Sequence, residues 1–148
     1  MSDVGTRRTG NRGPAAVELR VAARPENLAV LRTLVGAVGT FADLDLDSVA
    51  DLRLAVDEAC TLLIRSASPG ASLVVVVDPG DDDVVVQVSA DCGADEVVTP
   101  ASLSWMVMSS LTDVVEVFHD GVQPSGDGDP VGRLFGITLT TRRAGASR

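Results

Sequence analysis

Few residues of this chain have side chains suited to chemistry, and the most informative is Glu58, which lies inside the apolar run LRLAVDEACTLLIRSA at residues 52–67. Apolar residues recur at steps of three and four, which predicts a helix with one face in a core: Val49, Leu52, Val56, Ala59 or Cys60, and Leu63. Glu58, Leu62 and Arg65 fall on a different face. A carboxylate in a pocket can accept a hydroxyl proton, but a solvated helix glutamate has the same pattern. Whether this second face does chemistry is the main question that the sequence poses.

The cysteines and the histidine are the other reactive side chains. Cys60 falls on the buried side of the helix and is expected to be an inert core thiol, whereas Cys92 follows Asp91 in a predicted loop and is the better candidate for redox sensitivity. A bridge between the two cysteines would need Cα atoms within ~7 Å, which sequence does not establish. His119 has no cluster of metal ligands around it, so we expect a surface position at a strand end.

Length and charge limit the classes of function. A chain of 148 residues predicts one domain, here residues 17–143, between a basic, disordered tail at 1–16 and a short tail at 144–148. The formal charge of -9 repels phosphate backbones and argues against nucleic acid as a partner. A basic protein partner fits this charge, which otherwise serves only solubility. Without a membrane span or the apolar centre of a signal peptide, a cytoplasmic protein is expected.

The periodicity along the chain predicts the element order β-α-α-β-β-α-β-β. Strands are expected at residues 17–22, 73–77, 84–90, 114–118 and from 131 or 134 to 141. Helices are expected at residues 28–41 after Pro25, at 52–67 with Asp47 or Ser48 as the cap, and from Thr99 and Pro100 to about Leu111. This order predicts an α+β two-layer sandwich, with three helices on one face of a mostly antiparallel sheet of four to five strands. Trp105, Met106 and Met108 are explained by packing of the last helix on that sheet.

This order, with an acidic residue inside the second helix and an Asp-x-Gly after the hairpin, resembles the anti-sigma factors of the RsbW and SpoIIAB type. These are small relatives of the histidine-kinase ATPase domain, with a Bergerat-type fold. The strings RPENLAVLRTLVGAVGTFADLDLDSVADLRLAVDEAC, LIRSA, FHDG and FGITLTTRR carry the resemblance, which covers residues 15–143 and is closest to actinobacterial members. It implies ATP with magnesium as cofactors, and as partners a sigma factor and an anti-anti-sigma protein with a STAS domain, which the family phosphorylates on serine.

The resemblance also implies roles for single residues of the nucleotide site. Glu58 matches the family's base towards the attacking serine. Four residues later the family places a magnesium-ligating Asn, and here that position is Leu62, which offers no oxygen, so no metal site is expected. Asp91 and Gly93 match the first half of the Asp-x-Gly-x-Gly motif that binds adenine, whereas Asp95 replaces its last glycine and adds a charge that repels polyphosphate. Alternatively, this segment is simply a turn after a strand.

Two further segments complete the comparison with the family. Ser102 and Ser104 stand where a Gly-x-Gly would let backbone amides approach the phosphates, so the glycine cradle is missing, although serine hydroxyls can cap the helix. The family's first helix uses an Arg to contact the sigma factor, and Arg32 corresponds to it, with Glu26 and Asn27 nearby. A guanidinium can hold a carboxylate bidentately, but a solvated helix arginine is an equal alternative.

The three nucleotide motifs depart from the family together, whereas partner binding needs none of them. The sequence therefore favours a binding protein that sequesters a stress-type sigma factor, of the sigma-F or sigma-B kind, and releases it when an anti-anti-sigma protein competes. The alternative is an ATP-dependent serine kinase that acts on that antagonist. The retained Glu58, Asp91 and Gly93 favour this alternative. Weak binding of ATP or ADP stays open. The resemblance also implies a homodimer formed through the first helix and the strand beside it.

Overall fold

The computed structural model describes residues 12–93, 97–120 and 133–143. The elements follow one another along the chain as β1 (Val17–Ala22), the 3-10 turn η1 (Pro25–Asn27), α2 (Leu28–Phe41), α3 (Leu46–Ser66), β2 (Ser72–Pro79), β3 (Asp83–Cys92), α4 (Leu103–Leu111), β4 (Val114–Asp120) and β5 (Arg133–Arg142). This is the order that the sequence predicts. The expectations for residues 1–11, for Asp95, for a strand start at residue 131 and for the tail at 144–148 lie outside the described residues.

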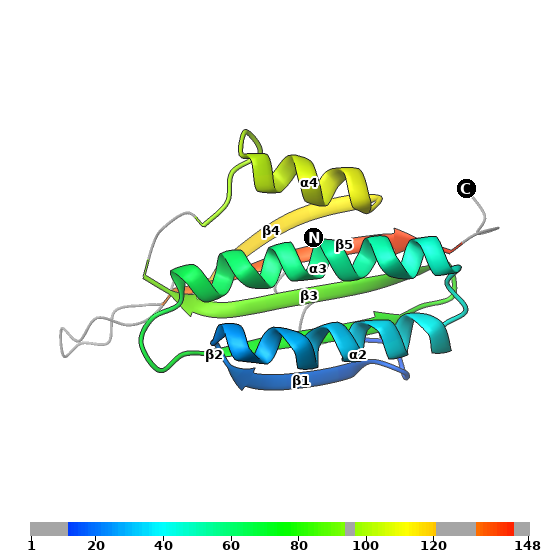
Figure 1. Cartoon of the computed structure of the whole chain (residues 1–148), viewed down its shortest axis with the longest axis horizontal. Coiled ribbons are helices and arrows are strands. Elements are labelled where there is room, and N and C mark those ends of the chain that lie inside the picture. Colours follow the sequence, from blue (N-terminus) through cyan, green and yellow to red (C-terminus); the bar gives the residue numbers. More distant parts are fainter. Residues whose placement is uncertain (1–11, 94–96, 121–132, 144–148) are drawn as a thin grey trace.

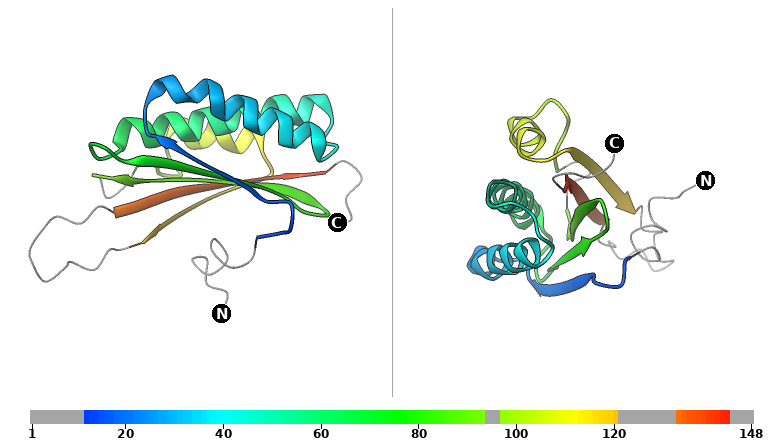
Figure 2. Two further views of the ribbon diagram at one scale, coloured as in Figure 1. Left: turned by 90° about the horizontal axis from the view of Figure 1, so that it is seen from below. Right: turned by 90° about the vertical axis from the view of Figure 1, so that its right-hand side faces the viewer.

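The molecule has two layers. The five strands form one antiparallel sheet in the order β1-β2-β3-β5-β4. The three α-helices lie side by side on one face of this sheet, with α3 between α2 and α4 (Figures 1 and 2). The predicted α+β sandwich is confirmed, and the hairpin strands β2 and β3 lie inside the sheet, as their apolar sequences predict.

Strand alternation separates a helix-covered face of the sheet from an open face. In β3 the even-numbered residues from Val84 to Cys92 are buried, whereas the odd-numbered residues from Asp83 to Asp91 are partly or fully exposed. Register carries the same division across the sheet, because Val86 pairs with Leu139 and Val88 with Ile137. The side-chain period of two therefore fixes which residues of each strand can reach the helices.

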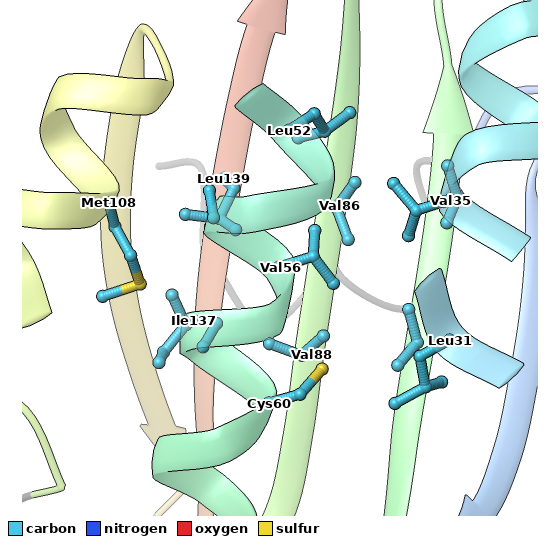
Figure 3. Close-up of a cluster of buried hydrophobic side chains, with 14 of the residues drawn as sticks. Leu31, Val35, Leu52, Val56, Cys60, Val86, Val88, Met108, Ile137 and Leu139 are labelled. Carbon is cyan, nitrogen blue, oxygen red and sulfur yellow. The ribbon is translucent and has the colours of Figure 1, made fainter. Parts of the chain in front are cut away.

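The core lies between α2, α3 and the covered face of the sheet. Figure 3 shows Leu31 and Val35 of α2, and Leu52, Val56 and Cys60 of α3, over Val86, Val88, Ile137 and Leu139. The side chains that the sequence assigns to the core stripe of α3 are all buried. On the open face, the Phe118 ring lies against Gly136, and a Cβ at that position would collide with the ring. Only glycine fits beneath Phe118.

The start of α3 differs from the prediction. The helix begins at Leu46, and its cap is Asp45, whose carboxylate accepts a 2.7 Å hydrogen bond from the Ser48 amide; Asp47 and Ser48, the predicted caps, lie inside the helix. Leu46 is 82% exposed, and the buried stripe from which the helix was predicted begins only at Val49. The capping bond lowers the pKa of Asp45 below its ordinary value, because it favours the charged form.

The turn between α2 and α3 brings the two helices close together. Asp43 adopts a left-handed conformation with φ of 63°. The amide of Asp43 donates to the Thr40 carbonyl, and that of Leu44 donates to the Gly39 carbonyl, both at 3.1 Å, which is the hydrogen-bond pattern of a Schellman motif. The motif ends α2 abruptly, so that α3 can return along it.

β3 is longer than predicted, and α4 begins later than predicted. β3 continues through Asp91 and Cys92, which the sequence placed in a loop, and both residues keep their pairing with β5. α4 begins at Leu103 instead of Thr99, because the Ser102 hydroxyl accepts a 3.1 Å hydrogen bond from the Trp105 amide and caps the helix. Among the described helices, none is long and apolar enough to cross a membrane.

Candidate functional site

The second face of α3 lies beside α4, and Glu58 makes the polar contact between them. Its carboxylate is half-buried and accepts a 2.6 Å hydrogen bond from the Ser104 hydroxyl in the first turn of α4. The two residues are 46 positions apart in sequence. Sequence analysis assigned them to different motifs, the base and the lost glycine cradle, and the structure brings them together. The bond engages the same carboxylate that would have to take a proton from a substrate serine.

Leu62, the position at which the resemblance implies a magnesium ligand, is apolar and points to the core. Leu62 follows Glu58 by about one turn, is half-buried and packs against the core cluster. A hard cation such as magnesium requires oxygen ligands in near-octahedral geometry, and this side chain has none. In residues 12–93, 97–120 and 133–143, no three His, Cys, Asp or Glu side chains gather as a possible metal site. Leu62 therefore supplies no ligand to the magnesium of a nucleotide at this face.

The expected adenine-binding residues lie at the end of β3, away from Glu58. Asp91 is exposed, pairs with Leu134 of β5 and belongs to the alternate set of β3 that faces away from the helices. It lines a cavity of about 470 Å³ on the open face, which Ser89 and Gln87 of the same strand also line. Glu58, on α3, lies above the opposite face. The structure therefore does not bring Asp91 and Glu58 into one pocket.

Gly93 and Ser102 use their polar groups within the fold. The Gly93 amide donates to the Ser66 carbonyl at the end of α3, at 3.1 Å. The Ser102 hydroxyl, besides capping α4, donates to the Thr99 carbonyl at 2.8 Å. These bonds stabilise the chain on either side of residues 94–96. They do not form a row of amides aimed at a phosphate.

The expected partner-binding residues lie on or next to α2. Arg32 is 46% exposed, and its Nε and Nη2 each lie 3.0 Å from Oδ1 of Asp57 on α3. Glu26 is 68% exposed and forms a 3.4 Å ion pair with Arg24. The Asn27 amide group donates to the Ala22 carbonyl at 2.7 Å and so ties η1 to β1. Arg32 and Glu26 are thus available at the surface, whereas Asn27 has a structural bond.

Asp57 is the residue of this surface that sequence reasoning missed. Periodicity places Arg32 on the outer side of α2, but it does not show which residue of α3 lies opposite. The adjacent acidic pair Asp57-Glu58 in an otherwise apolar run was the available signal. The two carboxylates reach different neighbours, since Asp57 pairs with Arg32 of α2 and Glu58 with Ser104 of α4.

Neither cysteine is exposed. Cys60 is fully buried, as predicted, whereas Cys92 is only 1% exposed, so the expected loop position of Cys92 is wrong. Cys92 lies in β3, on the face of the sheet that the helices cover. Burial raises the pKa of both thiols, helped by the Asp57 charge at Cys60 and the Asp91 charge at Cys92, where it reaches about 11. Both thiols are uncharged and shielded at neutral pH.

The structure also shows the positions of His119 and of the large side chains of α4. His119 is exposed near the end of β4, as predicted, and its ring stacks on Phe135 with centroids 6.0 Å apart. On α4, Met108 is fully buried and Trp105 packs partly against the core. Met106 is 61% exposed, so helix-to-sheet packing does not explain it.

Comparison with known proteins assigns the chain to a family. The histidine kinase-like ATPase domain matches residues 21–124, which is most of the chain. The chain belongs to the histidine kinase-like ATPase family. Within this family it is 64% identical, over 137 residues, to the anti-sigma-F factor RsbW of Mycobacterium tuberculosis, in both strains CDC 1551 and H37Rv. The alignment covers 93% of this chain and 79% of the relative.

The family match concerns the fold and bears on the contacts of Glu58, Leu62 and Ser104. An ATPase-type domain suggests nucleotide binding in general. In this chain, Leu62 packs against the core, and the serine at the start of α4 is bonded to Glu58. The domain has the architecture of the family, and Glu58 and Ser104 on this face bond to each other within the protein.

Proposed function

We propose that this protein is an anti-sigma factor, which binds a stress-type sigma factor and keeps it from RNA polymerase until an anti-anti-sigma protein competes for it. The observation that carries the proposal is the contrast between two surfaces. Arg32 is exposed and held in place by Asp57, whereas Glu58 is engaged by Ser104 and no oxygen stands at Leu62. The identity of 64% to a protein named an anti-sigma-F factor supports this proposal.

Arg32 is the proposed anchor for the sigma factor. A guanidinium has five donors, and the ion pair with Asp57 occupies Nε and one side of Nη2. Its remaining donors can hold a carboxylate of the partner, and Asp57 reduces the conformational freedom that Arg32 would lose on binding. Glu26 lies near the start of the same helical segment and extends the polar surface. The proposed partner therefore presents an acidic side chain opposite Arg32.

Binding of the sigma factors of the same cell to immobilised protein tests this function. We expect one of them to bind, and we expect Arg32→Ala to weaken that binding by at least about tenfold, as truncation of a buried interface arginine does. Arg32→Lys should restore only part of it, because an ammonium cannot form the bidentate contact. Arg20→Ala is the matched control, since Arg20 is exposed on the open face of the sheet. Absence of binding to every sigma factor of the cell would refute the proposal.

A serine kinase is the alternative, and no contact in the structure favours it. Incubation with labelled ATP and the anti-anti-sigma protein distinguishes the two functions, and we expect no transfer of label. Calorimetric titration with ATP and ADP completes the test: we propose weak binding that magnesium does not strengthen, because Leu62 offers the ion no oxygen. Tight, magnesium-dependent binding together with label transfer that Glu58→Ala abolishes would favour the kinase.

A further inference from the structure

The helix α4 lies against α3 with one side and exposes the other side to solvent. Met108 is its only fully buried residue among nine. Leu103 is 75% exposed and Met106 is 61% exposed, so much of its apolar surface faces solvent. Elements with little buried apolar surface open locally at a lower cost in free energy than the core does. Met108, Trp105 and Leu111 pack on the core, and the polar contact to α3 adds to this packing in fixing the position of α4.

That contact has the geometry of a strong hydrogen bond. The Ser104 hydroxyl donates to Oε2 of Glu58 at 2.6 Å in a partly buried setting. Hydrogen bonds from hydroxyl to carboxylate fall in this short range and contribute more than bonds between neutral groups. A hydroxyl next to a carboxylate is also the arrangement of a serine about to be deprotonated by a base. Here both groups belong to the same chain.

We infer that Ser104 is a blocking residue: its hydroxyl occupies Glu58 in place of a serine from another protein and holds α4 closed over this face of α3. The inference deepens the proposed function, on which it rests for its meaning, because it explains why a member of an ATPase family would bind a partner without transferring phosphate. Ser104 touches no substrate and acts only through Glu58 and the position of α4. A glycine at this position could not make the bond.

Labelling of carboxylates with a water-soluble carbodiimide and an amine, read by mass spectrometry, tests the block directly. In Ser104→Ala we expect the labelling of Glu58 to rise severalfold, because the carboxylate loses its partner and gains solvent. Asp57, in the same peptide but paired with Arg32, should keep its rate and serves as an internal control. Ser109→Ala is the matched variant, since Ser109 is an exposed serine of the same helix, and it should change neither rate.

Hydrogen exchange of the α4 amides is the second readout. We expect exchange to be about tenfold faster in Ser104→Ala. The net free energy of a hydrogen bond to a charged group changes the equilibrium for local opening by a factor of about ten or more. Glu58→Ala should accelerate exchange to the same extent, and the double variant should add little to either, which is the signature of a direct pair. Circular dichroism checks that each variant is folded at the temperature of the exchange measurement.

The outcomes separate this inference from the proposed function. Unchanged Glu58 labelling and unchanged α4 exchange in Ser104→Ala would overturn the block, whatever the protein binds. Additive effects of the two single variants would overturn it as well. Conversely, sigma-factor binding by Ser104→Ala is expected to match the parent, because Arg32 lies on α2. Loss of sigma-factor binding in the parent would leave the labelling result standing.

Discussion

Asp57 and Glu58 show how two adjacent carboxylates on one helix can serve different neighbours. Successive positions on an α-helix are about 100° apart, so Asp57 is directed to Arg32 on α2 while Glu58 accepts from Ser104 on α4. Both are half-buried. A carboxylate in such a setting is best stabilised by a specific donor. The pair therefore fixes side chains on both flanking helices from the centre of the layer.

Thiol reactivity is the first prediction at the scale of single residues. With a pKa of about 11, only about one Cys92 thiol in a thousand is ionised at pH 8, and Cys60 is ionised still less. We expect an aromatic disulfide reagent to modify the native protein far more slowly than it modifies the protein in denaturant, where both thiols react. Stoichiometric modification of the native protein within minutes would contradict the burial of both cysteines.

The cap of α3 gives a second, pH-dependent prediction. The pKa of Asp45 in the folded protein lies below its ordinary value of 3.8, so its stabilising effect is complete above that value and is lost as the pH falls through the folded pKa. We expect Asp45→Ala to lower the melting temperature by a constant amount above about pH 5, and the difference from the parent to shrink below pH 3.8. Asp45→Asn, which caps without a charge, should change less with pH. A difference that stays constant into acid would contradict the lowered pKa.

At the scale of the elements, Gly39 of α2 packs against Val49 of α3. A Cβ there would lie 3.2 Å from Cγ2 of the buried Val49, which has no room to move. At Gly36, one turn earlier, a Cβ would instead lie 3.3 Å from Cδ of the exposed Arg53, which can swing into solvent. The crossing of the two helices therefore depends on one glycine and not on the other.

Alanine substitution at the two glycines tests this packing. Alanine favours a helix over glycine by about 1 kcal/mol, so we expect Gly36→Ala to raise the free energy of unfolding by up to that amount. In Gly39→Ala the same gain is outweighed by overpacking against Val49, which costs about 1–3 kcal/mol. Chemical denaturation of the two variants measures both values. Equal stabilisation by both substitutions would show that the helices are further apart at Gly39 than the structure places them.

For the molecule as a whole, the open edges of the sheet limit how it can associate. β1 and β4 are the edge strands, and unpaired strand edges invite pairing with another chain. Next to β1, the helix α2 exposes 48% of Val30, and β1 itself exposes 38% of Val17. An apolar side chain on each of two adjacent elements is consistent with the homodimer that the resemblance implies, which stays a proposal.

Association is best tested with paired charge substitutions. We expect light scattering during size-exclusion chromatography to give twice the chain mass, and Val30→Glu to shift the protein towards the monomer. Leu103→Glu, which introduces the same charge at a 75% exposed apolar residue of α4, should leave the mass unchanged. A monomer in the parent protein at high concentration would contradict the proposed dimer. So would dissociation by Leu103→Glu alone.

The sequence predicts the element order and the buried stripe of α3 because these follow from local periodicity. It also contained the signal for Cys92, since the alternation of buried residues from Val84 to Ala90 continues for one more step. The bond from Ser104 to Glu58 joins residues 46 positions apart, and no local pattern reports such a contact. The placement of Asp91 on the open face likewise required the register of β3 with β5.

The half-buried Trp105 on α4 has a practical consequence. It is the only tryptophan of the chain, which contains no tyrosine, so the intrinsic fluorescence of the protein comes almost entirely from one ring. That ring is next in sequence to Ser104 and packs partly against the core. Emission from a tryptophan moves to longer wavelength as the indole becomes more hydrated. The native protein therefore carries its own optical reporter of the environment of α4, without an added dye.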